Sequence, residues 1–219
     1  MHHRRDRARR PEPAARDRAR ATEERSLIDP RFVGAFPRAD APLDPPLPEI
    51  AFLGRSNVGK STLLNALVGR RIAKVSATPG KTTALTVFQV DFEAQFYFLD
   101  LPGYGYARAS HGRRTGFRRL VAGALDRERL AGAVWLLDLR HDPSADDRTM
   151  QDALAAAGTR VLAALTKSDK LPRGQQRRRA EAVRALLSLD EDQVIVTSAR
   201  TGEGVTELRE AIEALVRDA

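Results

Sequence analysis

The stretch Gly54-Arg55-Ser56-Asn57-Val58-Gly59-Lys60-Ser61 decides the fold, because it matches the pattern G-x-x-x-x-G-K-[ST]. It lies between an apolar run at 50–53 and a leucine-rich helical pattern at 63–68. Its glycines let successive backbone N–H groups face a phosphate, and the dipole of the following helix adds positive potential. On this interpretation Lys60 reaches the β- and γ-phosphates and the Ser61 hydroxyl binds Mg²⁺. The alternative is a glycine turn that caps a helix and binds nothing.

Short apolar runs alternate with amphipathic helical patterns on both sides of this phosphate loop. We expect strands at 32–36, 50–53, 85–90, 96–99, 134–137, 161–165 and 194–196, and helices from about 63 to 68 and at 113–125, 145–157, 177–187 and 206–216. This alternation predicts an α/β fold with a mostly parallel sheet and helices on both faces. In such a sheet, ligands bind at the carboxyl ends of the strands.

The segment Asp100-Leu101-Pro102-Gly103 ends the strand expected at 96–99. A carboxylate at this place can hold Mg²⁺ through water, and the glycine N–H can meet a γ-phosphate. The alternative is an ordinary strand-end D-x-P-G turn. The phosphate loop upstream favours the first interpretation.

Two polar segments follow the next expected strands, Thr166-Lys167-Ser168-Asp169 after 161–165 and Thr197-Ser198-Ala199 after 194–196. The Asp169 carboxylate can accept from the two N–H donors on one edge of guanine, a pair that adenine lacks. The Lys167 stem would pack over the base, and a backbone N–H at Ser198 or Ala199 would donate to guanine O6. Each segment alone could be a polar loop, but their order after successive strands favours a guanine nucleotide.

The loop 76–83 lies between the phosphate loop and Asp100 and contains Pro79, Gly80, Lys81, Thr82 and Thr83. We expect it to contact the nucleotide, with the Thr82 hydroxyl on Mg²⁺ when a γ-phosphate is present and the loop released after hydrolysis. The alternative is a flexible connector.

Together these segments resemble the translation-factor-related GTPases of the TrmE-Era-EngA-EngB group, and within them the bacterial EngB family. The resemblance runs from about Phe32 to the C-terminus, and its most specific parts are 49–61, 78–82, 100–107 and 166–170. Thr at position 166, in place of the Asn of a general N-K-x-D match, is similar to this family's pattern. The resemblance implies a P-loop G domain at 26–219 in a cytoplasmic, Mg²⁺-dependent GTPase that acts in large ribosomal subunit assembly and in cell division and septation. We expect a monomer.

The expected reaction is in-line attack of water on the γ-phosphate, with Lys60, the loop N–H groups and the metal neutralising charge. Tyr104 stands where Ras-type enzymes place a glutamine that orients the water, so we expect slow hydrolysis. Related GTPases with an asparagine at the position of Asn57 use it to hold K⁺. We therefore count Asn57, Lys60 and Thr82 as the catalytic candidates, the alternative for Asn57 being a loop-stabilising amide.

The charge balance favours a polyanionic partner such as ribosomal RNA. The chain of 219 residues has 37 Lys and Arg against 29 Asp and Glu, a net charge of +8. Arg113, Arg114, Arg118 and Arg119 form one candidate patch and Arg177–Arg179 another; the alternative is that both are solvated helix faces. Residues 1–25 hold nine arginines and almost nothing that could join a core, so we expect a disordered tail. An arginine-rich genome could equally explain the overall charge.

Other classes of protein are excluded or disfavoured by the composition. The chain has no Cys, which excludes disulfides, Cys-based zinc or iron–sulfur sites and thiol catalysis, and its four histidines are scattered. The longest apolar run, at 131–137, is too short to span a bilayer. The basic N-terminus lacks the apolar stretch of a secretory signal.

Three other functions stay open at this point. An ATP-using P-loop enzyme would require that Asp169 does not read the base, which competition between ATP and GDP would reveal. A nucleotide-binding scaffold would release no phosphate. A septum-localised structural protein is a third candidate, although the sequence shows no coiled coil or membrane anchor to support it.

Overall fold

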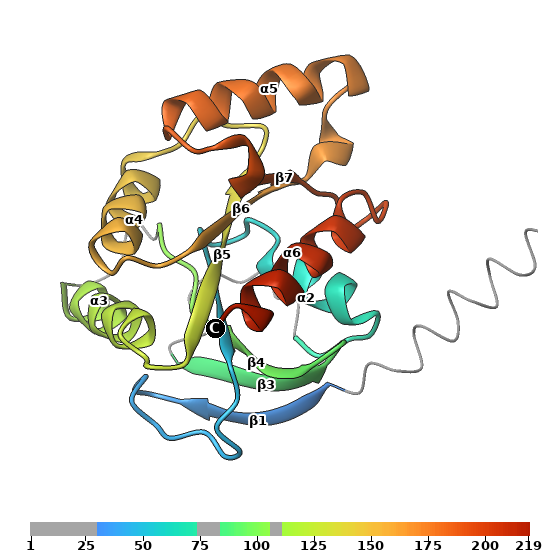
Figure 1. The fold of residues 1–219 in the computed structure, drawn as a ribbon. Helices are drawn as coiled ribbons and strands as arrows, with labels where there is room; N and C mark the ends of the chain where they lie inside the picture. The colour runs from blue at the N-terminus through green and yellow to red at the C-terminus, as the bar shows by residue number, and fades with distance from the viewer. Residues whose placement is uncertain (1–29, 74–83, 106–110) are drawn as a thin grey trace, which may run out of the picture.

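The computed structural model describes residues 30–73, 84–105 and 111–219, which build one seven-stranded sheet with helices on both sides (Figure 1). The strands are β1 (Arg31–Phe36), β2 (Glu49–Gly54), β3 (Leu85–Asp91), β4 (Gln95–Asp100), β5 (Leu130–Asp138), β6 (Val161–Thr166) and β7 (Val194–Val196). The helices are α2 (Lys60–Val68), α3 (His111–Leu125), α4 (Ala145–Ala156), α5 (Arg173–Leu186) and α6 (Val205–Arg217), with short 3-10 turns η1 (Ser168–Lys170) and η2 (Glu191–Gln193). The expected tail at 1–25 lies outside the described residues.

The strand order β1-β3-β4-β2-β5-β6-β7 places five parallel strands next to one another. Strands β4, β2, β5, β6 and β7 run parallel, whereas β3 pairs antiparallel with β4 and β1 pairs antiparallel with β3. The expected α/β fold with a mostly parallel sheet is confirmed. Because the five strands point the same way, their carboxyl ends meet at one edge of the sheet.

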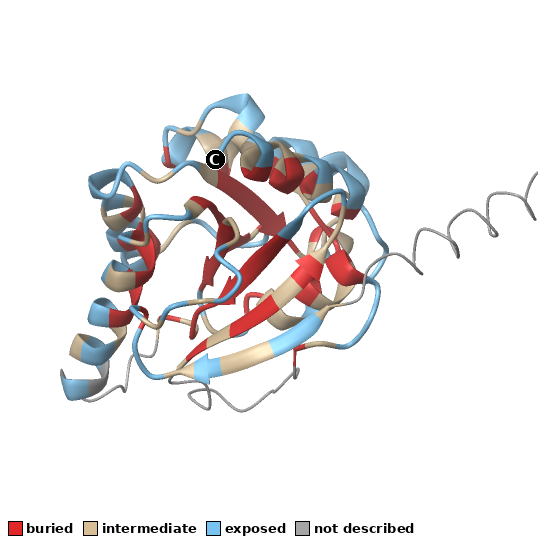
Figure 2. Cartoon of the chain, turned by 60° about the horizontal axis from the view of Figure 1, so that its bottom comes forward, coloured by how far each residue is buried: buried red, intermediate tan, exposed pale blue. Residues whose placement is uncertain are grey.

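Two apolar layers cover the sheet, one on each face. The buried residues of α2 and α6 pack on one face, and those of α3, α4 and α5 pack on the other. Along β2, Ile50 and Phe52 join the first layer while Ala51 and Leu53 join the second. A strand buried on both faces has to be apolar at every position, and Figure 2 shows such strands at the centre of the molecule.

Two elements start four residues earlier than the sequence patterns indicate. Strand β5 begins at Leu130 rather than Val134, because its first residues already pair with the start of β2. Helix α5 begins at Arg173 rather than Arg177, directly after Pro172. Proline favours the start of a helix, since its missing N–H would have no partner there. The first turn of α5 is polar and has no apolar periodicity, so the sequence pattern did not include it.

A buried ion pair fastens the segment between β1 and β2 to the sheet. The Arg127 guanidinium donates to both carboxylate oxygens of Glu49 and to the carbonyls of Ala39 and Ala41. The Arg127 and Glu49 side chains are 12% and 3% exposed. Removing one partner would leave the other charge buried alone, which is strongly destabilising. Among the described residues, no helix is long and apolar enough to cross a membrane.

Candidate functional site

Four of the predicted motif segments lie at one edge of the sheet, at the carboxyl ends of parallel strands. The phosphate loop follows β2, Asp100 ends β4, Thr166 ends β6, and Thr197 follows β7. The fifth expected segment, with Pro79, Gly80, Lys81, Thr82 and Thr83, lies outside the described residues.

The phosphate loop turns directly into helix α2, which begins at Lys60. Gly59 stands at the N-cap with φ of 109°, a conformation that L side chains rarely adopt, so the position favours glycine. Val58 is buried between the loop and the sheet. The loop backbone is therefore fixed on the N-terminus of α2, where unpaired N–H groups and the helix dipole attract anions.

Lys60 and Asp100 bring opposite charges together at the mouth of this loop. The Lys60 ammonium, from the first turn of α2, donates to Asp100 Oδ1 at the end of β4. Both side chains are nearly buried, at 11% and 10% exposed. Ser61 is the next residue of the same helical turn. The loop thus offers an ammonium group with a carboxylate and a hydroxyl, and hard oxygen donors of this kind are the ligands that Mg²⁺ prefers.

The Asp100–Gly103 segment packs directly on the phosphate loop. A Cβ added at Gly103 would lie 2.9 Å from Ser56 Cα and 3.0 Å from Ser56 N, so only glycine fits without a shift of backbone. The following residue, Tyr104, forms a backbone bridge with the loop. Its N–H donates to Gly54 O at 3.2 Å and its carbonyl accepts from Ser56 N at 2.8 Å. Leu101 and Pro102 are buried beneath.

A cavity of about 580 Å³ lies beside the segments that follow β6 and β7. It is lined by Asp169, Arg173, Gln176, Thr201, Gly202 and Glu203. Asp169 Oδ1 accepts from the Ser198 hydroxyl at 2.8 Å, whereas Oδ2 is buried without a hydrogen bond. A carboxylate oxygen in that condition has full capacity to accept from a ligand. Ser198 N–H donates to Glu203 O, which leaves the Ala199 N–H as the candidate donor to guanine O6.

The charge on Asp169 is stabilised from several sides. The hydrogen bond from Ser198, followed by the charges of Lys170 and Arg200, lowers the pKa of Asp169 below its usual range, against the effect of burial. The two cations lie 3.6 and 3.7 Å from Oδ2. Asp169 therefore remains ionised at neutral pH and acts only as an acceptor.

Glu203 and Gln176 contact the segments that follow β6 and β7, and neither was predicted from the sequence as a site residue. Glu203 accepts from the buried Ser168 hydroxyl at 2.5 Å, while its backbone carbonyl holds Ser198. Gln176 donates to Ser168 O at 3.0 Å. Glu203 sits between two glycines, Gly202 and Gly204, and this T-G-E-G turn was the one local signal available.

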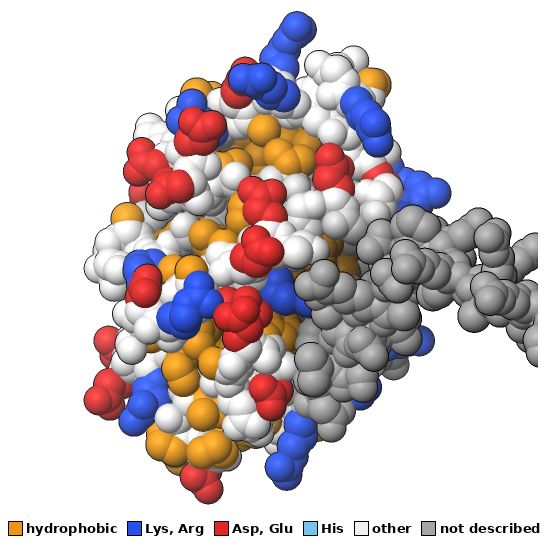
Figure 3. Space-filling model, turned by 45° about the vertical axis from the view of Figure 1, so that its right-hand side comes forward, with side chains coloured by type: hydrophobic (Ala, Val, Ile, Leu, Met, Phe, Trp, Pro, Cys, Tyr) orange, Lys and Arg blue, Asp and Glu red, His pale blue; other side chains and the backbone are white. Residues whose placement is uncertain are grey.

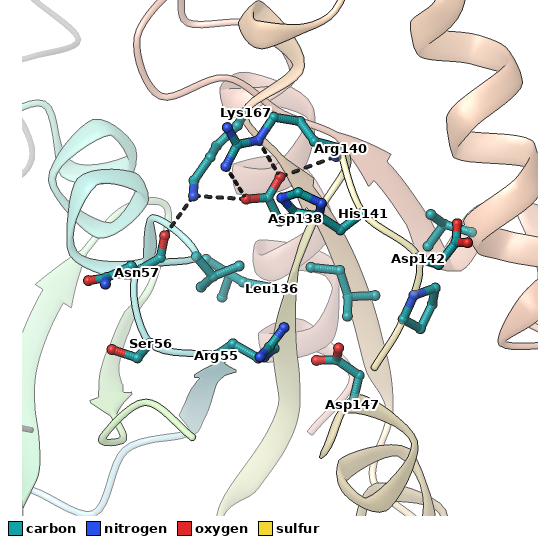
Figure 4. A pocket seen from close by; sticks show the side chains of 14 residues that line it. Arg55, Ser56, Asn57, Leu136, Asp138, Arg140, His141, Asp142, Asp147 and Lys167 are labelled. Atoms are coloured by element: carbon teal, nitrogen blue, oxygen red, sulfur yellow. Dashed lines mark hydrogen bonds and ion pairs between the residues drawn. The ribbon is translucent and has the colours of Figure 1, made fainter. Parts of the chain in front are cut away.

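Lys167 links the base side of the site to the phosphate loop. Its ammonium donates to Asn57 O at 2.6 Å and to Asp138 Oδ2 at 2.9 Å, and Arg140 completes the group with two 2.8 Å bonds to Asp138. In Figure 4 these side chains point toward one another on one wall of a cavity of about 260 Å³, with Arg55 on the opposite side. Asp138 was expected only to end an apolar run.

Burial alone would raise the pKa of Asp138, but hydrogen bonds from Arg140 and Lys167 outweigh it and hold that pKa well below its usual range.

Thr166 makes a second contact with the phosphate loop. Its Oγ1 lies 2.7 Å from Val58 O and 3.1 Å from Leu137 O. Thr at this position therefore performs a structural task, joining the end of β6 to the loop after β2.

Asn57 and Tyr104 occupy very different surroundings. Asn57 has an exposed side chain on a left-handed backbone, with φ of 63°, and its side-chain amide makes no hydrogen bond within the described residues. Tyr104 is 6% exposed and turns into the core. The side chain that follows Gly103 thus packs in the core.

The predicted arginine patches differ in structure. Arg114, Arg118 and Arg119 are exposed on α3, while the Arg113 side chain lies outside the description. On α5, Arg177 pairs with Glu181 and Arg179 donates to Asp142 at 2.9 Å, so two of those three arginines already have acidic partners. On the side of the molecule shown in Figure 3, basic and acidic side chains are intermixed. The α3 arginines remain the stronger candidate for an anionic partner.

Comparison with known proteins gives a consistent family. The family described as "50S ribosome-binding GTPase" matches residues 49–167. The chain is 51% identical over 172 residues to the probable GTP-binding protein EngB of Gemmatimonas aurantiaca, covering 78% of this chain and 83% of that protein. It is 40% identical to the protein of the same name from Bacillus subtilis, covering 78% and 88%.

A solved structure shares the fold. The crystal structure of Era in complex with MgGDPNP and a segment of 16S ribosomal RNA aligns with a TM-score of 0.65 and 24% identity, covering 76% of this chain and 55% of that one. At this identity the likeness concerns the fold alone.

Proposed function

The chain belongs to the EngB family of GTP-binding GTPases, and from that premise we propose that it is a slow, Mg²⁺-dependent switch in assembly of the large ribosomal subunit. The observation that supports this most directly is the position of Lys60 and Asp169 at one edge of the sheet, joined through Lys167 and the phosphate loop. Family membership favours GTP hydrolysis over the ATP-using and non-enzymatic alternatives.

In this proposal the phosphate loop, residues 54–61, wraps the phosphates of GTP or GDP. The Lys60 ammonium leaves Asp100 to contact the β- and γ-phosphates, and the Gly103 N–H meets the γ-phosphate. Asp169 accepts from the guanine N–H donors, and the Ala199 N–H donates to O6. Glu203 accepts from Ser168 and Thr166 donates to Val58 O, so we assign these two residues the role of holding the segments in place.

The donor set beside Lys60 fits a magnesium ion. Ser61 would ligate it directly and Asp100 through water, with Thr82 as the third expected protein ligand. When bound, the ion would neutralise charge on the β- and γ-phosphates. The Era structure described above contains MgGDPNP, which agrees with this assignment.

Slow hydrolysis follows from the direction of Tyr104. Its side chain is buried away from the phosphate loop, so the attacking water would lack the orienting amide that a glutamine supplies. We propose that K⁺ at the exposed Asn57 amide adds charge stabilisation at the γ-phosphate, with Lys60 and the loop N–H groups providing the rest.

The proposed partner is the large ribosomal subunit, contacted through RNA phosphates by the exposed arginines of α3. The family match to ribosome-binding GTPases and the net charge of +8 support this partner. We extend the proposal to a monomeric protein of the cytoplasm needed for normal cell division and septation, as the family resemblance implies.

Co-sedimentation with purified large ribosomal subunits tests the proposal. We expect more protein in the pellet with a non-hydrolysable GTP analogue than with GDP, and weaker binding as salt rises. The double variant Arg118→Ala, Arg119→Ala should bind less and show a smaller salt dependence. The matched control, Arg38→Ala with Arg217→Ala, removes two exposed charges elsewhere. Binding that is independent of nucleotide and salt would contradict the proposal.

Phosphate release provides the enzymatic control. Purified protein with GTP and Mg²⁺ should release phosphate slowly, and Lys60→Ala should release none above background. If the Lys60→Ala variant released phosphate as fast as the unaltered protein, the activity would have to come from outside this site.

A further inference from the structure

Tyr104 points away from the phosphate loop and is held in the core by two hydrogen bonds. Its hydroxyl donates to Asp147 Oδ1 and accepts from Trp135 Nε1, both at 2.8 Å. Trp135 lies on β5 and is fully buried, and Asp147 lies on α4 and is 4% exposed. The Tyr104 side chain is therefore anchored to two different elements of the fold.

The anchor is rigid at its far end. Asp147 Oδ2 accepts from the backbone N–H and the hydroxyl of Ser144, at 2.8 and 2.6 Å, and this capping box begins α4. Burial, reinforced by the Asp147 charge, raises the pKa of Tyr104 far above its usual range. The phenol therefore keeps its proton at neutral pH and can donate to Asp147.

The backbone of Tyr104 fixes the other end. Its N–H and carbonyl bond to Gly54 and Ser56 of the phosphate loop, and the preceding residue, Gly103, lies against the Ser56 backbone. Gly103 is thus held from one side by the loop and from the other by a neighbour whose side chain is locked. The segment has little freedom to move before a ligand arrives.

We propose that Tyr104 is a positioning residue: its hydroxyl, clamped between Trp135 and Asp147, holds the Gly103 N–H in place for the γ-phosphate. The inference rests on the proposed function, since only a nucleoside triphosphate brings a γ-phosphate to Gly103. A donor that is already ordered binds its ligand without the entropic loss of ordering the segment. GDP has no group at that position and gains nothing from the clamp.

The test is Tyr104→Phe, which removes the hydroxyl and keeps the ring. In Mg²⁺, we expect its Kd for a non-hydrolysable GTP analogue to rise about 3- to 10-fold, the effect of losing one or two buried hydrogen bonds. Its Kd for GDP should stay within about twofold of the unaltered protein. Because GDP binding requires the folded site, the ratio of the two constants separates positioning from general loss of stability.

Tyr97→Phe is the matched control. Tyr97 is also buried, and its hydroxyl donates to Pro45 O at 2.9 Å, in contact with the segment between β1 and β2 rather than with the phosphate loop. This variant should leave both constants unchanged. An equal loss for GDP and the analogue in Tyr104→Phe, or no loss for either, overturns the inference. Failure of the unaltered protein to bind either guanine nucleotide would instead overturn the proposed function.

Discussion

The ammonium of Lys167 donates to the backbone carbonyl of Asn57 over 2.6 Å and so joins the segment after β6 to the phosphate loop after β2. Both residues have left-handed backbones, with φ of 64° and 63°, which the surrounding contacts have to maintain. Asp138 accepts from the same ammonium at 2.9 Å. One side chain therefore connects the segment proposed to contact the base with the phosphate loop, and the Asp138 carboxylate holds that side chain in place.

Replacing Asp138 should lower the stability of the protein, because it weakens this connection. We predict that Asp138→Asn lowers the free energy of unfolding at neutral pH by about 1–2 kcal/mol, because an amide receives weaker hydrogen bonds from Arg140 and Lys167 than a carboxylate does. Since the folded-state pKa of Asp138 is depressed, its contribution is present above the unfolded pKa of about 3.9 and is lost as pH falls through the folded pKa.

Urea unfolding between pH 7 and pH 3 measures this effect. The gap between the unaltered protein and the variant should narrow below about pH 4. Asp142→Asn, at an exposed carboxylate paired with Arg179, should show a smaller gap throughout. A gap for Asp138→Asn that is constant over this range would show that its ionisation is irrelevant to stability.

Base selectivity should depend on Asp169. We predict that Asp169→Asn weakens GDP binding by roughly 100-fold or more and shifts preference to xanthine nucleotides, because the amide can donate to the oxygen that xanthine carries in place of the guanine amino group. Competition of GDP and XDP against a fluorescent nucleotide measures the change. Unaltered preference for GDP, or displacement by ATP as efficient as by GDP, would remove Asp169 from base recognition.

Magnesium dependence should be concentrated at Asp100. We predict that Asp100→Asn reduces the gain in GTP-analogue affinity on adding Mg²⁺ by about 10-fold or more, because the ionised carboxylate that would hold the metal-bound water is gone. Titrations in Mg²⁺ and in EDTA give the comparison. Asp91→Asn, at the far end of β3, serves as control and should keep the full gain. Equal gains in all three proteins would argue against a metal at this carboxylate.

Potassium should act through Asn57 if the exposed amide binds it. At equal ionic strength, we predict that replacing Na⁺ by K⁺ accelerates GTP turnover roughly 10-fold or more, and that Asn57→Ala abolishes the difference. Initial rates of phosphate release provide the measurement. Turnover that is the same in both salts would favour the simpler role of Asn57 as a loop residue.

The fold was predictable because its central parallel strands are short, nearly continuous apolar runs. Strand β2 has to be buried on both faces, so Ile50–Leu53 is legible as a strand without knowledge of its neighbours. The phosphate loop was predictable for the same local reason, because Gly59 and Lys60 belong to a short contiguous motif between a strand and a helix. The polar beginning of α5 was missed because a solvated first turn leaves no apolar period.

The supporting residues of the site were not predictable, because their partners are far away in the chain. Asp138 contacts Lys167 and Glu203 contacts Ser168. The glycines beside Glu203 indicate a turn, but the sequence near Glu203 or Asp138 does not identify these distant partners. That Tyr104 cannot replace a water-orienting glutamine remains a prediction. Its anchorage by Asp147 depends on packing across the sheet, which residue patterns do not encode.

Strand β1 pairs only with β3 among the described strands, and the two are separated by some fifty residues that include β2 and α2. During synthesis on the ribosome, the first strand to emerge therefore has to wait for a partner made much later, whereas β2 can nucleate the interior with the helix that follows it. Phe32, which is 60% exposed and meets the ring of Phe88 edge-on, can dock only once β3 has been made. Strand β1 is thus expected to join the sheet only after β3 has been translated, although its own residues are made some fifty positions earlier.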